Sequence, residues 1–297
     1  MTAHRADPHV IPRRYGDDDT IGAANEINED AVVAAARLVR HGRRYQLGQV
    51  LSPESPTQMW RYWKQTLLTD RVLPERSFGS NQQTFIEEAV SGALHSGTHL
   101  DGLAHIGIGE YTYNGHRYAD IIGPGGVDLI GAENIPPFVT RGVLLDIARL
   151  RGVRMLGADE AVTADDLRDA EESVGVSVAR GDVVLIHTGW GTLWDDDPAI
   201  YRASEPGIDV GAARWLADRR VSVIGADNWA VERVAVHLDD EAFPAHQECI
   251  TRNGIYLLEN VRATELAADG VVEFCCIIAP IKLKGATASM VGPVAVV

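Results

Sequence analysis

The stretch HSGTHLDGLAH, residues 95–105, is the most informative part of this sequence. Three of the ten histidines of the chain fall within it, together with an aspartate. Imidazole nitrogens and carboxylate oxygens are donors that divalent metals such as zinc and manganese accept. The alternative interpretation is that the neighbouring histidines are ordinary surface or core residues with no role in a site. Four potential metal ligands or bases in one short, glycine-containing segment favour a metal site over that alternative.

His95, His99 and Asp101 are the predicted metal ligands. In an extended chain the two histidines would lie about 13 Å apart, at roughly 3.3 Å per residue. Both nitrogens must come within about 2.1 Å of one ion, so the backbone has to bend between them. Gly97 permits such a bend, and a Ser-Gly-Thr insert is a poor helix interior, so we expect a kinked loop. Beyond the kink, His99 and Asp101 are two residues apart and can point the same way from an extended segment.

His105 is the predicted proton shuttle. It lies four residues beyond Asp101, and the intervening Gly102 allows the chain to return to the same cavity without placing His105 on the metal. The ordinary pKa of histidine, about 6.5, suits proton transfer near neutral pH. The segment therefore predicts three ligands, a hinge and a base.

The whole chain is acidic and of ordinary globular composition. It has 297 residues with a formal net charge of −15, 45% hydrophobic and 23% charged residues. This charge argues against nucleic-acid or anionic-membrane partners, which need a basic surface, and leaves a small-molecule substrate. The start of the chain lacks the apolar run of a signal peptide, and no stretch reaches the roughly 20 apolar residues of a membrane span. With only three cysteines and no disulfide pattern, we expect a cytoplasmic protein.

Apolar, β-branched runs alternate with amphipathic stretches, which predicts an α/β fold with βα units. Thr163 and Asp166 form a capping-box pattern before one helix, and Gly175 ends it. Asp30 and Asp209 are candidate caps of two others. The expected helices cover residues 31–41, 167–174 and 210–220. The expected strands cover residues 142–147, 182–188, 221–226, 255–258 and 271–283, the last as one long strand or two shorter ones.

Residues 95–105 resemble the His-x-Gly-Thr-His-x-Asp-x-Pro-x-His signature of the metal-dependent cyclase or kynurenine formamidase-like family, which includes isatin hydrolases. Leu103 stands where the family usually has proline, which changes the local turn without removing a ligand. A second segment, residues 246–260, is similar to another part of the family site. There the resemblance implies Gln247 as the distal ligand, as in the isatin hydrolase-like branch, with His246 as the open alternative and a substrate contact. It also implies Glu259 as a catalytic residue, or one that acts on a second metal.

The resemblance implies a swivelling β/β/α fold of mixed sheets with flanking helices, and a homodimer or homotetramer. It covers the chain from about residue 50 onward. We therefore expect an N-terminal extension over residues 1–45 and a single catalytic domain over residues 46–297. Gln247 in the shell implies one divalent ion. Because an amide oxygen is a harder donor than imidazole, it favours Mn²⁺ over Zn²⁺.

Aromatic residues supply the candidate substrate contacts. Trp60 and Trp63 precede the motif and are interpreted either as a wall over a flat substrate or as packing and a subunit contact. Trp229 follows an expected strand, where α/β folds often place ligand contacts. For the nearby Asp227 and Glu232, a solvated surface role is as strong an interpretation as a site role.

The predicted ligands and base indicate a metal-dependent hydrolase. With the resemblance, we expect it to cleave an amide, lactam or ester bond of a small, cyclic or aromatic substrate. Two alternatives stay open: a metal-dependent cyclase, dehydratase or isomerase, and a non-catalytic metal-binding protein. The chain contains neither a phosphate-binding Gly-x-x-x-x-Gly-Lys-[Ser/Thr] motif nor a Gly-x-Ser-x-Gly serine-hydrolase motif.

Overall fold

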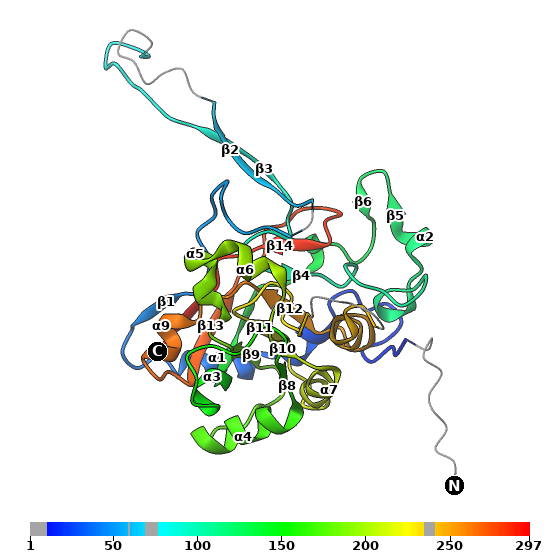
Figure 1. Ribbon diagram of the computed structural model, residues 1–297. Coiled ribbons are helices and arrows are strands. Elements are labelled where there is room, and N and C mark those ends of the chain that lie inside the picture. Colours follow the sequence, from blue (N-terminus) through cyan, green and yellow to red (C-terminus); the bar gives the residue numbers. More distant parts are fainter. Residues whose placement is uncertain (1–10, 59, 69–76, 235–240) are drawn as a thin grey trace.

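A nine-stranded mixed sheet forms the centre of the part of the chain described by this computed structural model, residues 11–58, 60–68, 77–234 and 241–297 (Figure 1). Flanking helices cover the sheet, as expected for mixed sheets in an α/β fold. In spatial order the strands are β1 (Arg44–Gln46), β15 (Val294–Val296), β13 (Glu273–Ile278), β7 (Phe138–Asp146), β9 (Val183–His187), β11 (Val223–Ala226), β12 (Tyr256–Glu259), β4 (His99–Asp101) and β14 (Ala288–Met290).

The four central strands β7, β9, β11 and β12 run parallel. All residues of β9 are buried, which is typical of a parallel strand covered on both faces. Alternate side chains enter two separate cores: Leu185 packs on one side of the sheet and Val184 and Ile186 pack on the other. The expected strands of this region are confirmed with small shifts at their ends. The last expected strand, residues 271–283, is shorter because β13 ends at Ile278, two residues before Pro280.

Two of the three expected helices are confirmed. Thr163 and Asp166 form the capping box of α4 (Ala164–Val174), and Asp209 caps α7 (Val210–Asp218). The first helix was placed wrongly: α1 spans Glu29–Ala36 with Asn28 as its cap. It ends early because the chain turns to join β1 at the edge of the sheet. The other helices are α2 (Tyr118–Ile121), α3 (Ile147–Leu150), α5 (Leu193–Asp196), α6 (Pro198–Ala203), α8 (Pro244–His246), α9 (Thr264–Ala268) and the 3-10 and π turns η1 (Gly22–Glu26), η3 (Tyr113–Gly115), η4 (Ala132–Asn134), η5 (Trp190–Thr192) and η6 (Gln247–Arg252).

The antiparallel pairing of β12 with β4 creates the platform for the site. Glu259 lies directly opposite His99, and Leu257 lies opposite Asp101. Because side chains alternate along a strand, His99 and Asp101 share one face of the sheet with Glu259. The register therefore brings together residues that are about 160 positions apart in the chain.

Three short pairs complete the fold: β10 (Gly207–Ile208) with β8 (Ala161–Val162), β5 (Ile122–Gly123) with β6 (Gly126–Val127), and β2 (Trp63–Leu67) with β3 (Glu88–Gly92). The β2–β3 hairpin projects away from the body (Figure 1). None of the helices in the described part of the chain is long and apolar enough to cross a membrane. Residues 1–10 of the expected N-terminal extension lie outside the described residues, and residues 22–26 contact the body through hydrogen bonds such as that from Ala23 N–H to the Gly254 carbonyl.

Candidate metal centre

The kink expected between His95 and His99 is present at Gly97, whose backbone has a φ of 62°. This left-handed conformation favours glycine, and an added Cβ would meet Leu51 Cδ2 at 2.5 Å. The Gly97 carbonyl accepts hydrogen bonds from His99 Nδ1 at 2.8 Å and from Asn260 Nδ2 at 2.9 Å. The turn thus ends with the His99 side chain fixed at the start of β4.

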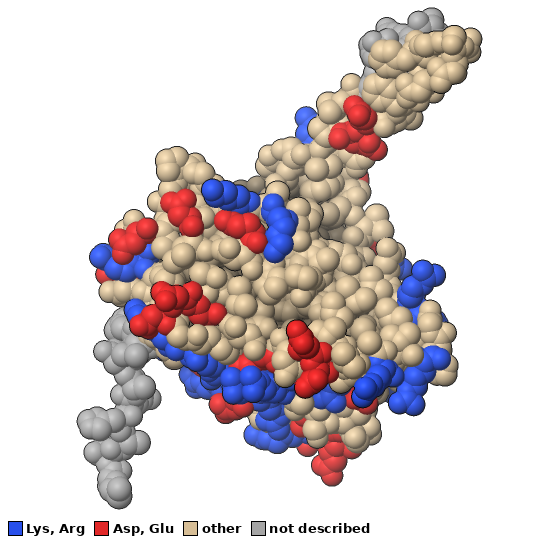
Figure 2. Space-filling model, turned by 180° about the vertical axis from the view of Figure 1, so that it is seen from behind, with Lys and Arg blue, Asp and Glu red and all other residues tan. Residues whose placement is uncertain are grey.

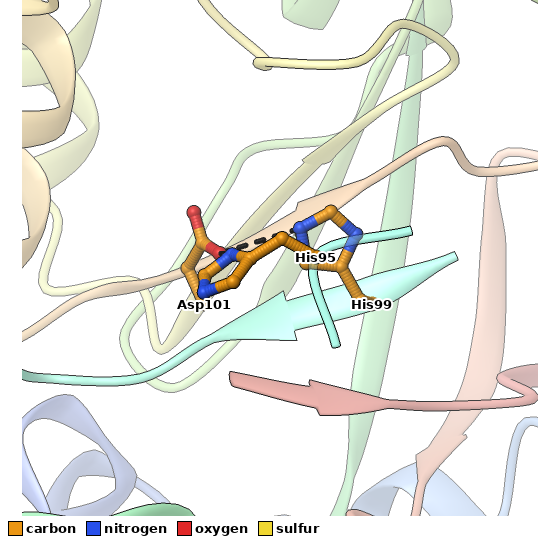
Figure 3. A group of neighbouring side chains, drawn as sticks. All are labelled: His95, His99 and Asp101. Atoms are coloured by element: carbon orange, nitrogen blue, oxygen red, sulfur yellow. Dashed lines mark ion pairs between the residues drawn. The ribbon is translucent and has the colours of Figure 1, made fainter. Parts of the chain in front are cut away.

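His95, His99 and Asp101 form one group whose donor atoms all lie within 4.8 Å of one another (Figure 3). Asp101 Oδ1 is 2.8 Å from His95 Nδ1 and 3.4 Å from His99 Nε2. Although these atoms are close and buried, none of the three has a partner with hydrogen-bond geometry among the described residues. Buried polar atoms are rarely left without partners, so the convergence of these atoms fits the binding of a cation.

The hydrogen bonds of His99 and His246, both buried, determine which ring nitrogen of each histidine faces Asp101. A carbonyl can only accept, so His99 carries a proton on Nδ1 and turns Nε2 toward Asp101. His246 is likewise held through Nδ1 by the Glu232 carboxylate, and its Nε2 faces Asp101. In metal sites, a hydrogen bond made by the ring nitrogen that does not bind the metal orients the histidine. The Nε2 atoms of both rings therefore face the same carboxylate.

Asp101, His246 and Glu259 form a second group that shares Asp101 with the first. His246 Nε2 lies 3.4 Å from Glu259 Oε1 and 3.6 Å from Asp101 Oδ2, and Glu259 Oε2 lies 3.1 Å from His99 Nε2. Both oxygens of Asp101 lack a hydrogen-bond partner among the described residues. Asp101 thus stands between the motif histidines and the residues of the distant segment.

Glu232 holds His246 in place through hydrogen bonds. Its carboxylate accepts the backbone N–H of Ala245 at 3.0 Å and that of His246 at 2.9 Å, besides the His246 ring. Glu232 is buried, and so is Asp227, which accepts the backbone N–H of Thr188. The solvated interpretation of both residues was therefore wrong, because the loop after β11 folds inward over the sheet.

The pKa values of His105 and His99 are shifted in opposite directions. Burial lowers the pKa of His105 to about 4, despite the opposing charge of Asp101. Burial also acts to lower the pKa of His99, but the charges of Glu259 and Asp101 outweigh it and raise this pKa to about 10. His105 is consequently neutral near pH 7, whereas His99 is protonated until a cation replaces the proton. His105 Nε2 is 3.8 Å from Asp101 Oδ2, and its ring centroid is 4.0 Å from that of His95.

A cavity of about 190 Å³ opens onto His105, His246 and Glu259. Of the candidate substrate contacts, Trp60 and Trp229 line it, whereas Trp63 is not among its lining residues. No sequence pattern indicated the remaining lining residues, which come from separate loops. They are Gln58, Arg61, Ile106, Ala230 and Phe243. A larger cavity of about 520 Å³ lies elsewhere, against Leu144, Val174 and Val271, and none of the candidate ligands lines it.

Gln247 and His246 occupy different environments. The side-chain amide of Gln247 donates to the Gly107 carbonyl at 3.0 Å. His246 instead joins the buried group around Asp101. The two residues diverge because His246 ends the short helix α8 while Gln247 begins the π turn η6.

Comparison with known proteins agrees with this geometry. The Cyclase family model matches residues 45–233, and the chain belongs to this family of enzymes. The crystal structure of a novel cyclase is 32% identical, with a TM-score of 0.88 over 95% of this chain and 98% of that one. The search of curated proteins gave no match.

Two isatin hydrolases share the fold at lower identity. Isatin hydrolase A from Ralstonia solanacearum is 24% identical, with a TM-score of 0.63 over 91% of this chain and 97% of that one. An isatin hydrolase bound to the product analogue thioisatinate is 18% identical, with a TM-score of 0.65 over 91% and 99% of the two chains. The expected family resemblance is thus confirmed.

Proposed function

We propose that this protein is a metal-dependent hydrolase acting on an amide, lactam or ester carbonyl of a small substrate. The observation that carries the proposal is the convergence of unpartnered, buried donor atoms of His95, His99 and Asp101 beside the neutral imidazole of His105. A structural zinc site is closed by four protein ligands and has no use for such a base. The fold shared with isatin hydrolases supports the same class of reaction.

His95, His99 and Asp101 would hold the cation, with His246 rather than Gln247 as the distal ligand. When bound, a divalent cation supplies a Lewis acid that polarises a carbonyl and makes water more acidic. We propose one ion per chain. A donor set with His246 contains three imidazole nitrogens, which favours Zn²⁺ more than the set with Gln247 did, and Mn²⁺ is the alternative.

His105 carries the proton in the proposed reaction. Being neutral near pH 7, it accepts a proton from water as the water oxygen bonds to the carbonyl carbon. It then gives this proton to the leaving nitrogen or oxygen as the C–N or C–O bond breaks. Glu259, held between His99 and His246, orients the attacking water. The aromatic side chains of Trp60, Trp229 and Phe243 line a cavity suited to a small, flat substrate.

Removal and return of the metal test the proposal. Protein stripped with a chelator is assayed on cyclic imides, lactams, lactones and aryl formamides, before and after addition of Zn²⁺ or Mn²⁺. We expect no turnover in protein verified as metal-free, and turnover restored by one of the two ions. Full activity of the metal-free protein would refute the proposal.

A cyclase, dehydratase or isomerase is the second candidate, favoured by the 32% identical structure described as a cyclase. Reaction in H₂¹⁸O separates the two, because hydrolysis places solvent oxygen in the product and an isomerisation does not. A chain that binds metal but turns over none of these substrate classes would favour the third candidate, a non-catalytic metal-binding protein.

A further inference from the structure

Asn260 directly follows Glu259 at the end of β12, and each of its polar groups has a partner. Its φ is 56°, in the left-handed region that asparagine adopts more readily than most residues other than glycine. The residue is only 4% exposed. Its backbone N–H donates to the Asn228 carbonyl at 2.7 Å, and its side-chain Oδ1 accepts the Tyr201 hydroxyl at 2.7 Å. The remaining groups, the side-chain Nδ2 and the backbone carbonyl, both bond to residues of the segment 95–105.

The peptide between Gly97 and Thr98 is held by these two groups. Asn260 Nδ2 donates to the Gly97 carbonyl at 2.9 Å, and Thr98 Oγ1 donates to the Asn260 carbonyl at 2.7 Å. The Thr98 hydroxyl oxygen also accepts the backbone N–H of Gln49 at 2.8 Å. Asn260 therefore restrains both residues of this peptide. The restraint matters because glycine, at a φ of 62°, has more backbone freedom than any other residue.

The direction of the Gly97 carbonyl determines which ring nitrogen of His99 faces the metal group. The carbonyl that accepts Asn260 Nδ2 also accepts His99 Nδ1 at 2.8 Å. With the proton on Nδ1, His99 Nε2 faces Asp101 at 3.4 Å from Oδ1. A Gly97 carbonyl turned away would remove this acceptor and allow the other tautomer, which carries its proton on Nε2. The hydrogen bond of the outer nitrogen is what fixes the tautomer of a ligating histidine.

Tyr201 orients the side-chain amide of Asn260. Because Oδ1 can only accept, its bond with the Tyr201 hydroxyl leaves the NH₂ group to face the Gly97 carbonyl. Tyr201 is fully buried and packs edge to face on Trp194, with ring centroids 5.6 Å apart. Charged side chains are spread over the surface of the body (Figure 2), whereas the bonds of Asn260 join uncharged groups in the interior. Such bonds depend little on salt, unlike interactions between exposed charges.

We propose that Asn260 is a positioning residue for the metal centre, which fixes the Gly97 carbonyl and thereby holds His99 in the tautomer that presents Nε2. Asn260 is not among the residues that line the cavity opening onto His105, so it acts through Gly97 and not on a substrate. Tyr201 acts one step further out, on the amide of Asn260. The proposal rests on metal binding in the proposed function and requires no particular substrate.

Asn260→Gly tests this restraint without straining the backbone, because glycine readily adopts a φ of 56°. The affinity for Zn²⁺, measured by competition with a chelator, should fall roughly tenfold to a hundredfold, as it does when a ligating histidine loses its outer partner. The loss should be the same at low and high salt, because the network is uncharged. Tyr201→Phe removes only the hydroxyl and should lower the affinity by a smaller factor.

Asn114→Gly is the matched control. Asn114 is also buried and has a φ of 59°, and its Nδ2 donates to the backbone carbonyl of Gly16 at 3.0 Å. It lies in η3 and belongs to neither of the groups that share Asp101. The control therefore loses the same amide from the same backbone conformation, away from the metal centre. It should unfold at a lower urea concentration than the wild type but bind Zn²⁺ with wild-type affinity.

Proton exchange at the His99 ring, followed by nuclear magnetic resonance, separates positioning from a merely structural role. In the wild type the Nδ1–H of His99 is buried and bonded to the Gly97 carbonyl, so it should exchange slowly with water, with or without Zn²⁺. We expect the same slow exchange in Asn114→Gly. In Asn260→Gly the exchange should be at least about tenfold faster, because the carbonyl is no longer fixed.

Wild-type affinity for Zn²⁺ in Asn260→Gly, or a loss no larger than that in Asn114→Gly, would overturn the proposal. Slow exchange of the His99 proton in Asn260→Gly would also overturn it, because the Gly97 carbonyl would then stay in place without the amide. So would a loss of affinity that vanishes at high salt. A wild type that binds neither Zn²⁺ nor Mn²⁺ would refute the proposed function, whereas the exchange measurement needs neither metal nor turnover and would still decide whether Asn260 holds His99.

Discussion

Binding of a cation at this centre should release protons, because the pKa of His99 is about 10 in the metal-free protein. At about pH 7.5 a histidine with that pKa is almost fully protonated, whereas one with the ordinary pKa of about 6.5 is roughly one-tenth protonated. A cation that takes the Nε2 lone pair of His99 must therefore displace close to one proton. Burial lowers the pKa of His246 as well, but the carboxylates of Asp101 and Glu232 outweigh it and raise this pKa, so a second proton follows if His246 is a ligand.

The size of the effect follows from the pKa. Displacing a proton from a group with a pKa of about 10 at pH 7.5 costs roughly 3 kcal/mol, at about 1.4 kcal/mol per pH unit. That cost falls as the pH rises toward the pKa. The apparent affinity for the cation should therefore rise about tenfold per pH unit for each proton released, between about pH 7 and 9.

Isothermal titration calorimetry measures this release directly. Metal-free protein is titrated with Zn²⁺ or Mn²⁺ at one pH in two buffers whose ionisation enthalpies differ, and the difference in heat gives the number of protons. Glu259→Gln is the control, because it removes the charge that raises the pKa of His99 and should lower the release. A wild-type release near one-tenth of a proton, with an affinity independent of pH, would refute the argument.

Three further predictions concern the residues around the ligands. Gly97→Ala should lower the free energy of unfolding by at least about 1–2 kcal/mol in urea denaturation, because alanine is strained at a φ of 62° and its Cβ meets Leu51; an unchanged midpoint would contradict this. Glu232→Ala should weaken metal binding roughly 10–100-fold in a chelator competition, since it frees the ring of His246, and wild-type affinity would exclude the orienting role. His105→Ala should retain its metal, measured by mass spectrometry, while its kcat falls roughly 10²–10⁴-fold. The activity of the wild type should fall as the pH drops through about 4, because the His105 base, whose pKa is about 4, becomes protonated. Near wild-type turnover of that variant would show that His105 is not the base.

The features that could be predicted from the sequence are those that depend on local interactions. The kink at Gly97 and the shared direction of His99 and Asp101 depend on backbone geometry within a few residues. The capping box of Thr163 and Asp166 is equally local, and the structure confirms it. The central parallel strands were predictable because burial on both faces demands continuous apolar runs.

Long-range contacts, which no local pattern indicates, bring the distant residues of the candidate site together. The pairing of β12 with β4 sets Glu259 opposite His99, and strand register depends on the whole sheet. His246 is the last residue of α8 and joins the buried group around Asp101. Gln247, the first residue of η6, instead donates its side-chain amide to the Gly107 carbonyl. Burial likewise decided that Glu232 holds the ring of His246, because a carboxylate in a polar loop has the same sequence pattern whether it lies in water or in the interior.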